Sequence, residues 1–294
     1  MSRHSGSPWL PLGSLLLGML SFQFGAALAK QLFPVMGAQG ATAMRLGLGA
    51  LILWLLRQPW RRLSGRRGWM SLWGYGLTLG VMNLCFYMAL RTIPLGIAVA
   101  LEFIGPLTIA LFGSRRVLDL LWVGLVVVGL ALLLPWREHA QALDPIGVLY
   151  VMGAAAGWAA YIVLGRHAGL AFGSDAVALG SAIGALVAVP VGVVHAGTAL
   201  FSLAALPFAF GVAVLSSALP YSLEMYALTR LPARTVGILL SIEPALGALL
   251  GLAFLHEHLD LFQWLAIISI IAASIGAVFG TRNSAMEHGD PGAS

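Results

Sequence analysis

The sequence predicts an all-α polytopic membrane protein with ten transmembrane helices, arranged as two inverted five-helix repeats. Three observations favour this fold class. Of the 294 residues, 60% are hydrophobic and 9% are charged, with a mean hydropathy of +0.92. The chain divides into apolar segments of about 20 residues, the length that crosses a bilayer. Its two halves also resemble each other at a nearly constant offset. Because soluble domains carry about 25% charged residues, this composition excludes an ordinary soluble fold.

The predicted spans follow one another with short connections, which leaves no room for a sizeable soluble domain. They cover residues 10–29, 38–56, 69–90, 95–113, 118–136, 145–165, 175–195, 204–226, 235–255 and 261–280. The first segment also resembles a signal peptide, but its likeness to the sixth favours a retained helix. Residues 281–294 are polar and are predicted to form a disordered cytoplasmic tail.

The internal resemblance has an offset of 135 to 141 residues. At an offset of 138, Ala89-Leu90 recurs as Ala227-Leu228, Pro94 as Pro232, Pro106 as Pro244, and Ala110-Leu111 as Ala248-Leu249. We therefore predict a first repeat over residues 1–143 and a second over residues 144–280. Because each repeat has an odd number of spans, the second enters the bilayer upside down. Inverted repeats enclose a site near the midplane that can open to either side, as in secondary transporters.

The positive charges predict the orientation of the chain. With a cytoplasmic N-terminus, twelve of the 16 Lys and Arg residues lie in inner loops or termini. Only Lys30, Arg91 and Arg137 lie on the outer side. This bias follows the positive-inside rule and places both termini in the cytoplasm. The arginines of residues 57–67 therefore orient the chain, with an anionic-lipid contact as the alternative. Nucleic-acid binding is excluded, because no folded basic face exists.

Four ionisable residues lie well inside predicted spans: Arg45, Glu102, Glu224 and Glu243. A charged group at this depth is costly and usually faces a cavity or a partner. We therefore predict the three glutamates as cavity carboxylates. For Arg45, the alternatives are a substrate-carboxylate partner and a structural counter-ion to one glutamate.

Two prolines predict helix breaks at matching places in the repeats. Pro106 has no N–H to donate and crowds the carbonyl of Glu102. Pro244 does the same to Leu240, and it also disfavours helical geometry at Glu243. Interrupted helices at corresponding positions point to the binding site of a transporter. Ordinary proline kinks, which membrane helices tolerate, are the alternative.

Polar and aromatic side chains mark further candidates for the transport pathway. Tyr221 and Glu224 share one face of their predicted helix, together with Ser217. In the equivalent span of the first repeat, Asn83 and Tyr87 lie four residues apart, with Asn83 aligned to Tyr221. Further candidates are Lys30, Trp158 and Tyr161, although tryptophan and tyrosine are also common at membrane interfaces.

These residue types suit a zwitterionic substrate such as an amino acid. Arg45 or Lys30 could pair with its carboxylate, and a glutamate with its ammonium group. Because removal from water disfavours the charged form of a carboxyl group, the same glutamates could exchange protons near neutral pH. Proton antiport is therefore chemically available.

Other functions find little support. The sequence His256-Glu257-His258 lacks the i, i+4 histidine spacing of a zinc helix, and no phosphate-binding loop occurs, so we predict no metal site and no cofactor. Cys85 is alone and forms no disulfide framework. An intramembrane enzyme would need clustered catalytic residues at a membrane face, and the histidines are scattered. Glycine pairs four residues apart, such as Gly76 and Gly80, predict close helix contacts, either within the bundle or in a possible homodimer.

Five stretches carry a resemblance to a known family: 26–34, 40–53, 93–107, 215–235 and 241–251. On them the chain resembles the drug/metabolite transporter superfamily, in its EamA-type branch. Within that branch it is similar to bacterial inner-membrane exporters of threonine and homoserine. The resemblance implies proton-driven export of small neutral amino acids from the cytoplasm. The alternative substrates are other metabolites, such as aromatic amino acids or drugs. One departure is His256-Glu257, where the family often has Gly-Glu.

Overall fold

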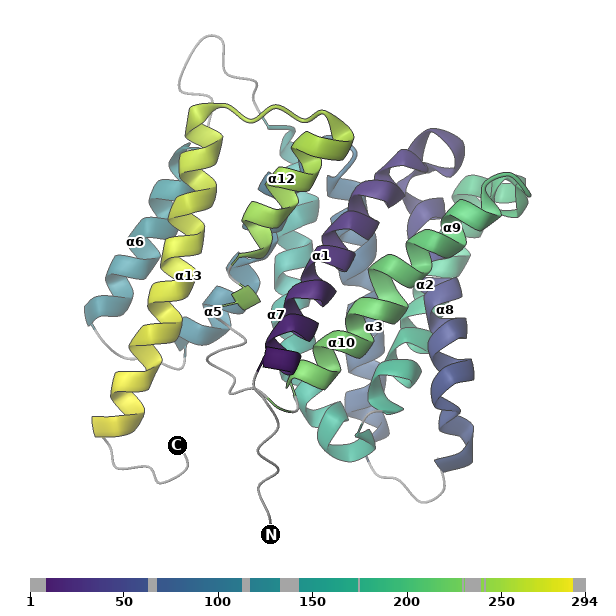
Figure 1. The fold of residues 1–294 in the computed structure, drawn as a ribbon, viewed down its shortest axis with the longest axis horizontal. Coiled ribbons are helices and arrows are strands. Elements are labelled where there is room, and N and C mark those ends of the chain that lie inside the picture. The colour runs from purple at the N-terminus through teal and green to yellow at the C-terminus, as the bar shows by residue number, and fades with distance from the viewer. Residues whose placement is uncertain are drawn as a thin grey trace.

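The protein is mainly helical over the residues that its computed structural model describes: 9–62, 68–112, 117–132, 143–173, 175–228, 230, 239–240 and 242–287. No strand occurs in these ranges. The helices stand side by side (Figure 1). Their bounds are α1 Trp9–Gln31, α2 Phe33–Arg57, α3 Trp69–Ala89, α4 Leu95–Glu102, α5 Ile104–Phe112, α6 Val117–Leu132, α7 Pro145–Phe172, α8 Asp175–Ala196, α9 Leu206–Ala213, α10 Leu219–Leu228, α12 Glu243–Leu255 and α13 Leu261–Glu287.

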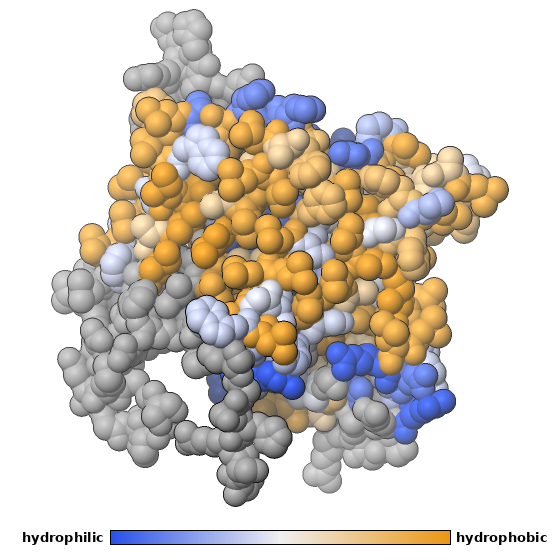
Figure 2. All heavy atoms as spheres, in the orientation of Figure 1, coloured by the Kyte–Doolittle hydropathy of each residue, from blue (hydrophilic) through white to orange (hydrophobic). Residues whose placement is uncertain are grey.

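Several helices have the length and composition of membrane spans. Five segments meet both conditions in the described ranges: Trp9–Gln31, Phe33–Arg57, Pro145–Phe172, Asp175–Phe201 and Leu206–Glu224. Shorter apolar helices cover Leu95–Ile109, Glu243–Leu255 and Leu261–Ala273. Figure 2 shows apolar side chains across the middle of the visible face, with hydrophilic ones gathered towards its two ends. Such an all-helical architecture is that of a polytopic membrane protein.

Helices α1 and α7 run in opposite directions. Lys30, near the end of α1, and the backbone N–H of Leu95, at the start of α4, both bind the carboxylate of Glu257. Three residues before Leu95, the hydroxyl of Thr92 donates a hydrogen bond of 2.8 Å to Asp144, which caps the start of α7. The end of α1 therefore lies on the side where α4 and α7 begin (Figure 1).

Glycines allow the closest helix contacts. A Cβ atom added to Gly80 of α3 would lie 2.7 Å from the backbone oxygen of Gly184 of α8. One added to Gly76 would lie 2.8 Å from the oxygen of Gly180. The predicted pairs Gly76/Gly80 and Gly180/Gly184 therefore pack against each other within one chain, as close helix crossings require. The possible homodimer stays a prediction.

Several helices are interrupted. In α2, Gly37 has a φ of 69° and bends the helix. Helix α4 ends at Glu102, whose carbonyl cannot receive an N–H from Pro106, and α5 begins after Phe103. Pro244 is the second residue of α12, where its missing N–H costs no hydrogen bond. Between α9 and α10 the chain forms a π-helical turn, Val214–Ala218.

The end of the last helix differs from the prediction. Helix α13 continues to Glu287, into the stretch predicted as a disordered tail from residue 281. The added turns contain no proline or glycine, and the first such residue after them is Gly289. A polar composition is compatible with a helix that extends beyond the apolar bundle. Residues 288–294, and Arg137 at the predicted repeat boundary, lie outside the described residues.

Candidate functional site

A cavity lies between helices from both halves of the chain. Its empty space is about 690 Å³, including the part open to solvent. The cavity is lined by Leu15, Gly18, Met19, Phe22, Gln23, Met82, Val99, Glu102, Trp158, Tyr161, Pro220, Tyr221, Glu224, Leu240 and Glu243.

The three predicted glutamates all border this cavity. Glu102 is the last residue of α4, Glu224 lies in α10, and Glu243 is the first residue of α12. Glu102 and Glu243 are each 8% exposed. Two of the three therefore stand at helix ends, where the breaks near Pro106 and Pro244 occur. Three carboxylates around one cavity can accept hydrogen bonds from an ammonium group or take up protons.

Arg45 is completely buried beside the cavity. Its Nε donates a hydrogen bond of 3.2 Å to Ser217 Oγ, and its Nη2 donates one of 3.3 Å to the hydroxyl of Tyr221. Its guanidinium also lies 5.2 Å from the ring centre of Phe22 and 5.0 Å from that of Tyr87. These distances are within the range of cation–π attraction.

Arg45 does not form the ion pair with a glutamate that was one of its two predicted roles. Among the described residues, no carboxylate lies within 4.0 Å of the guanidinium. Hydroxyl groups and aromatic faces replace it, and Nη1 has no hydrogen-bond partner. The π-helical turn contributes to this arrangement, because it carries Ser217. Such turns occur frequently at functional sites.

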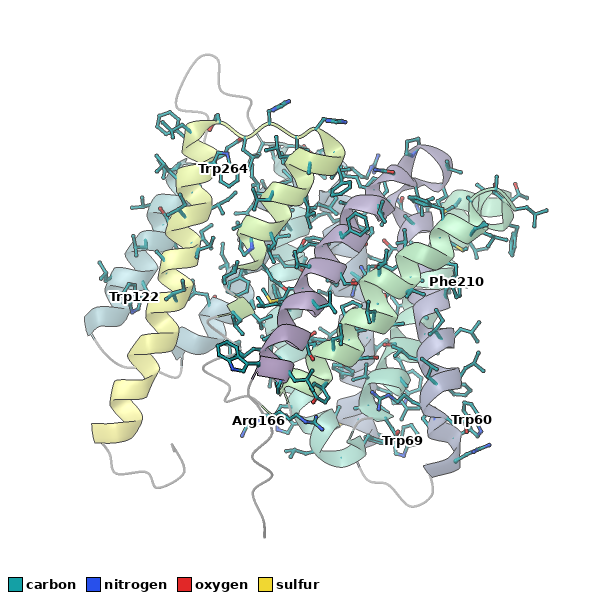
Figure 3. All side chains as sticks on the ribbon, in the orientation of Figure 1. Trp60, Trp69, Trp122, Arg166, Phe210 and Trp264 are labelled. Carbon is teal, nitrogen blue, oxygen red and sulfur yellow. The ribbon has the colours of Figure 1, made fainter. Side chains whose placement is uncertain are left out.

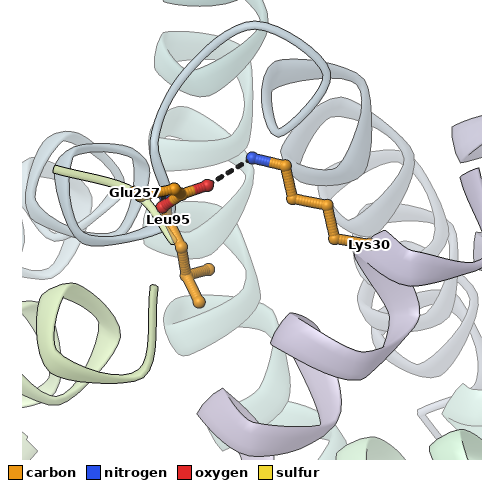
Figure 4. A network of polar contacts seen from close by, with 3 residues as sticks. All are labelled: Lys30, Leu95 and Glu257. Carbon is orange, nitrogen blue, oxygen red and sulfur yellow. Dashed lines mark hydrogen bonds and ion pairs between the residues drawn. The ribbon is translucent and has the colours of Figure 1, made fainter. Parts of the chain in front are cut away.

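Other predicted residues lie away from the cavity wall. Lys30 forms an ion pair with Glu257 instead (Figure 4). Asn83 is buried and donates its amide hydrogen to the carbonyl of Leu79, one turn earlier in α3. Tyr87 is buried, and its ring is one of the two aromatic faces beside Arg45.

Both predicted aromatic residues of α7 line the cavity. Trp158 packs edge-to-face against Phe103, with ring centres 5.4 Å apart. The hydroxyl of Tyr161 receives a hydrogen bond of 3.3 Å from Tyr75. Three other tryptophans lie towards the ends of the bundle: Figure 3 shows Trp60 and Trp69 near the end where α1 begins, and Trp264 near the opposite end. The aromatic residues of α7 therefore line the cavity, whereas the tryptophans near the ends of the bundle lie where membrane-interface residues are expected.

Sequence reasoning missed the partner of Lys30. Glu257 is 227 residues away, in the connection between α12 and α13. Its other oxygen accepts a hydrogen bond of 2.7 Å from the backbone N–H of Leu95. His256 precedes it with a φ of 54°, a left-handed conformation that glycine adopts without strain. The Gly-Glu pattern of the family could have drawn attention to Glu257, because it marks a tight turn directly before this carboxylate.

The comparisons with known proteins agree with this architecture. Residues 145–279 match the EamA-like transporter family. The threonine/homoserine exporter RhtA of Salmonella typhimurium is 53% identical over 274 residues, which are 93% of each chain. The protein of the same name from Escherichia coli is 52% identical over the same share. A solved crystal structure has a TM-score of 0.58 over 96% of this chain and 98% of its own. Its 18% identity makes this a likeness of fold alone.

A helical bundle with a buried, carboxylate-lined cavity and such relatives is a membrane transporter, not an enzyme. The chain belongs to the EamA-like transporter family. Within that family, the relatives described above are named as exporters of threonine and homoserine.

Proposed function

We propose that this protein exports threonine, homoserine and related small neutral amino acids from the cytoplasm across a bacterial inner membrane, in exchange for protons. The observation that carries the proposal is the cavity, in which three glutamates from both halves of the chain meet. The substrate follows from relatives at 52–53% identity that share 93% of this chain.

The cavity offers a partner for each end of an amino acid. Its carboxylates suit the ammonium group. Tyr221 and Phe22 line the cavity and also contact the guanidinium of Arg45. The buried Nη1 of Arg45 has no hydrogen-bond partner. Since buried donors are usually paired, we propose that the carboxylate of the substrate reaches it when the ring of Tyr221 or Phe22 shifts.

Protons can use the same glutamates. A glutamate in a space with little water is stabilised as the anion when the substrate ammonium binds, and as the neutral acid when the substrate leaves. Alternate occupancy by proton and amino acid would couple their opposite movements. The proposed coupling is therefore competition for shared carboxylates.

The packing of the helices supports ten spans in two inverted repeats. Helix α3 packs on α7, and the repeat equivalents of these helices, α10 and α1, pack on each other. Equivalent helices α2 and α8 contact each other, as do α6 and α13. The opposite directions of α1 and α7 fit the inversion. The family match over residues 145–279 corresponds to the proposed second repeat.

The charges support cytoplasmic termini and a cavity that faces the cytoplasm. Arg57 is the last residue of α2 and Arg61 follows shortly after it, and Arg166 lies towards the same end of the bundle, where α1 begins (Figure 3). Along α1, the cavity extends from Leu15 to Gln23. Lys30 lies seven residues beyond Gln23, or about 10 Å along a helix. Its ion pair with Glu257 therefore closes the opposite, outer side.

The decisive experiment uses purified protein in proteoliposomes with an imposed pH gradient. Wild-type protein should accumulate labelled threonine against its concentration gradient. The Glu102→Gln variant should lose this accumulation, because an amide cannot carry the proton. It should also weaken exchange of labelled for unlabelled threonine, because the amide lacks the negative charge that binds the ammonium group. Undiminished pH-driven accumulation by Glu102→Gln would remove Glu102 from the coupling. Absence of threonine transport by the wild type would overturn the proposed substrate.

A further inference from the structure

The side chain of Gln23 in α1 is 1% exposed and borders the cavity. Neither its amide nitrogen nor its amide oxygen has a hydrogen-bond partner. A primary amide can donate two hydrogen bonds and accept two. Leaving all of them unmade in a buried place is costly, so such a group usually has a partner in the working state.

The amide of Gln23 lies close to the helix faces that carry Glu102 and Glu243. A Cβ atom added to Gly247 of α12 would lie 3.4 Å from Gln23 Oε1 and 3.2 Å from the side chain of Val99 in α4. The amide therefore lies where α1, α4 and α12 meet. Gly247 is four residues after Glu243, and Val99 is three residues before Glu102. Residues at these spacings share a helix face, so Gln23 faces the same space as both carboxylates.

The chemistry of an amide differs from that of the other polar groups around the cavity. Glutamates suit the ammonium group of a substrate, and an arginine suits its carboxylate. A neutral amide carries both a donor and an acceptor. The complementary neutral group is a hydroxyl, which also donates and accepts. Threonine and homoserine each carry one hydroxyl on the side chain, at neighbouring carbon positions that a flexible glutamine can reach.

We propose that Gln23 is a specificity-determining residue whose amide hydrogen-bonds the side-chain hydroxyl of the transported amino acid. This inference rests on the proposed function and deepens it. A site built to bind a hydroxyl discriminates against the analogue that lacks it, because the buried amide is then left unpaired. Replacing the amide by an apolar group should remove that discrimination.

The test compares threonine with 2-aminobutyrate, which has the same carbon skeleton without the hydroxyl. Full-length protein in proteoliposomes is loaded with unlabelled threonine, and uptake of labelled threonine is competed with each compound. Wild-type protein should prefer threonine. In Gln23→Met, which keeps the length of the side chain, the preference should fall at least tenfold, with 2-aminobutyrate still able to compete. Gln39→Met in α2 is the matched control, because Gln39 does not line the cavity.

Each outcome decides the question. An unchanged preference in Gln23→Met would overturn the inference and leave the proposed function intact. Loss of transport of both compounds would overturn it too, since Gln23 would then serve general binding or folding. A wild-type protein that transports neither threonine nor homoserine would instead overturn the proposed function. As a second measurement, thermal stabilisation of detergent-purified Gln23→Leu by each compound should show the same loss of preference.

Discussion

Lys30 and Glu257 join the end of α1 to the connection between α12 and α13, across 227 residues of chain. The same carboxylate accepts a hydrogen bond from the backbone N–H of Leu95, the first residue of α4. Both charged side chains are largely buried, with 21% and 13% exposed. A pair this sheltered from water is less screened than a surface pair. The pair therefore connects α1, α4 and the connection between α12 and α13 on one side of the cavity.

Removing the contacts of Glu257 with Lys30 and Leu95 should impair transport. We expect Glu257→Lys to lower the threonine exchange rate at least tenfold, because it repels Lys30 and loses the acceptor for Leu95. Glu257→Gln should be milder, since an amide oxygen can still accept from Leu95. The exchange rate in proteoliposomes measures both effects. If Glu257→Lys exchanged threonine at the wild-type rate, closure by this pair would not be part of the cycle.

The guanidinium of Arg45 should not be replaceable by an ammonium group. Arg45→Lys keeps the charge but cannot reach Ser217 and Tyr221 together while lying against both aromatic rings. We expect at least a tenfold higher concentration of threonine for half-maximal exchange. Arg57→Lys, at the end of the same helix, is the matched control and should behave as wild type. If Arg45→Lys and Arg57→Lys needed the same threonine concentration for half-maximal exchange, a specific role for the guanidinium of Arg45 would be excluded.

The cap of α7 predicts a pH-dependent stability. The hydrogen bond from Thr92, with those from the backbone N–H groups of Gly147 and Ile146, lowers the pKa of Asp144. Because the folded state binds the proton less tightly than the unfolded state, the contribution of Asp144 is complete above the unfolded pKa, about 3.9. It is lost as the pH falls through the lower, folded pKa.

The measurement is the melting temperature of detergent-purified protein between pH 7 and pH 3. Asp144→Asn should melt below wild type at pH 7, and the difference should shrink as the pH falls below about 4. Thr92→Val should show a smaller difference with the same pH dependence. A gap between Asp144→Asn and wild type that stays constant down to pH 3 would contradict this account.

The contact between α3 and α8 should not tolerate larger residues. A side chain at Gly80 would press on the backbone of Gly184, which cannot move aside as a flexible side chain can. Overpacking of this kind costs about 1–3 kcal/mol. We expect Gly80→Val to melt several degrees lower than wild type. Gly124→Val in α6, where an added Cβ meets nothing within 4 Å, is the matched control and should be nearly neutral.

Much of the site was predictable from the sequence, because membrane burial makes polar residues conspicuous. Glu102, Glu224 and Glu243 stood out as carboxylates inside apolar segments, and all three line the cavity. Trp158, Tyr161 and Tyr221 were chosen for their positions in predicted spans, and they line it too. The cost of placing a polar group in lipid provides the signal in each case.

The partners of these residues could not be predicted in the same way. Arg45 was expected to meet a glutamate, yet it contacts hydroxyl groups and aromatic faces. Lys30 was expected in the pathway, yet it pairs with Glu257. Charge indicates that a partner is needed but not which group in another helix supplies it. Gln23 drew no prediction of a role, because a single amide in an apolar helix resembles many that are paired.

Hydropathy and charge along the chain, by themselves, determined that this protein is helical, built for a bilayer, and supplied with carboxylates at depth. Those properties depend on the transfer of each segment from water, which local composition controls. Tertiary structure alone decided which groups meet: the pairing of Lys30 with Glu257, the aromatic surroundings of Arg45, and the unpaired amide of Gln23. Such contacts join residues far apart in sequence. They depend on the rotation and spacing of the helices, which local composition does not determine.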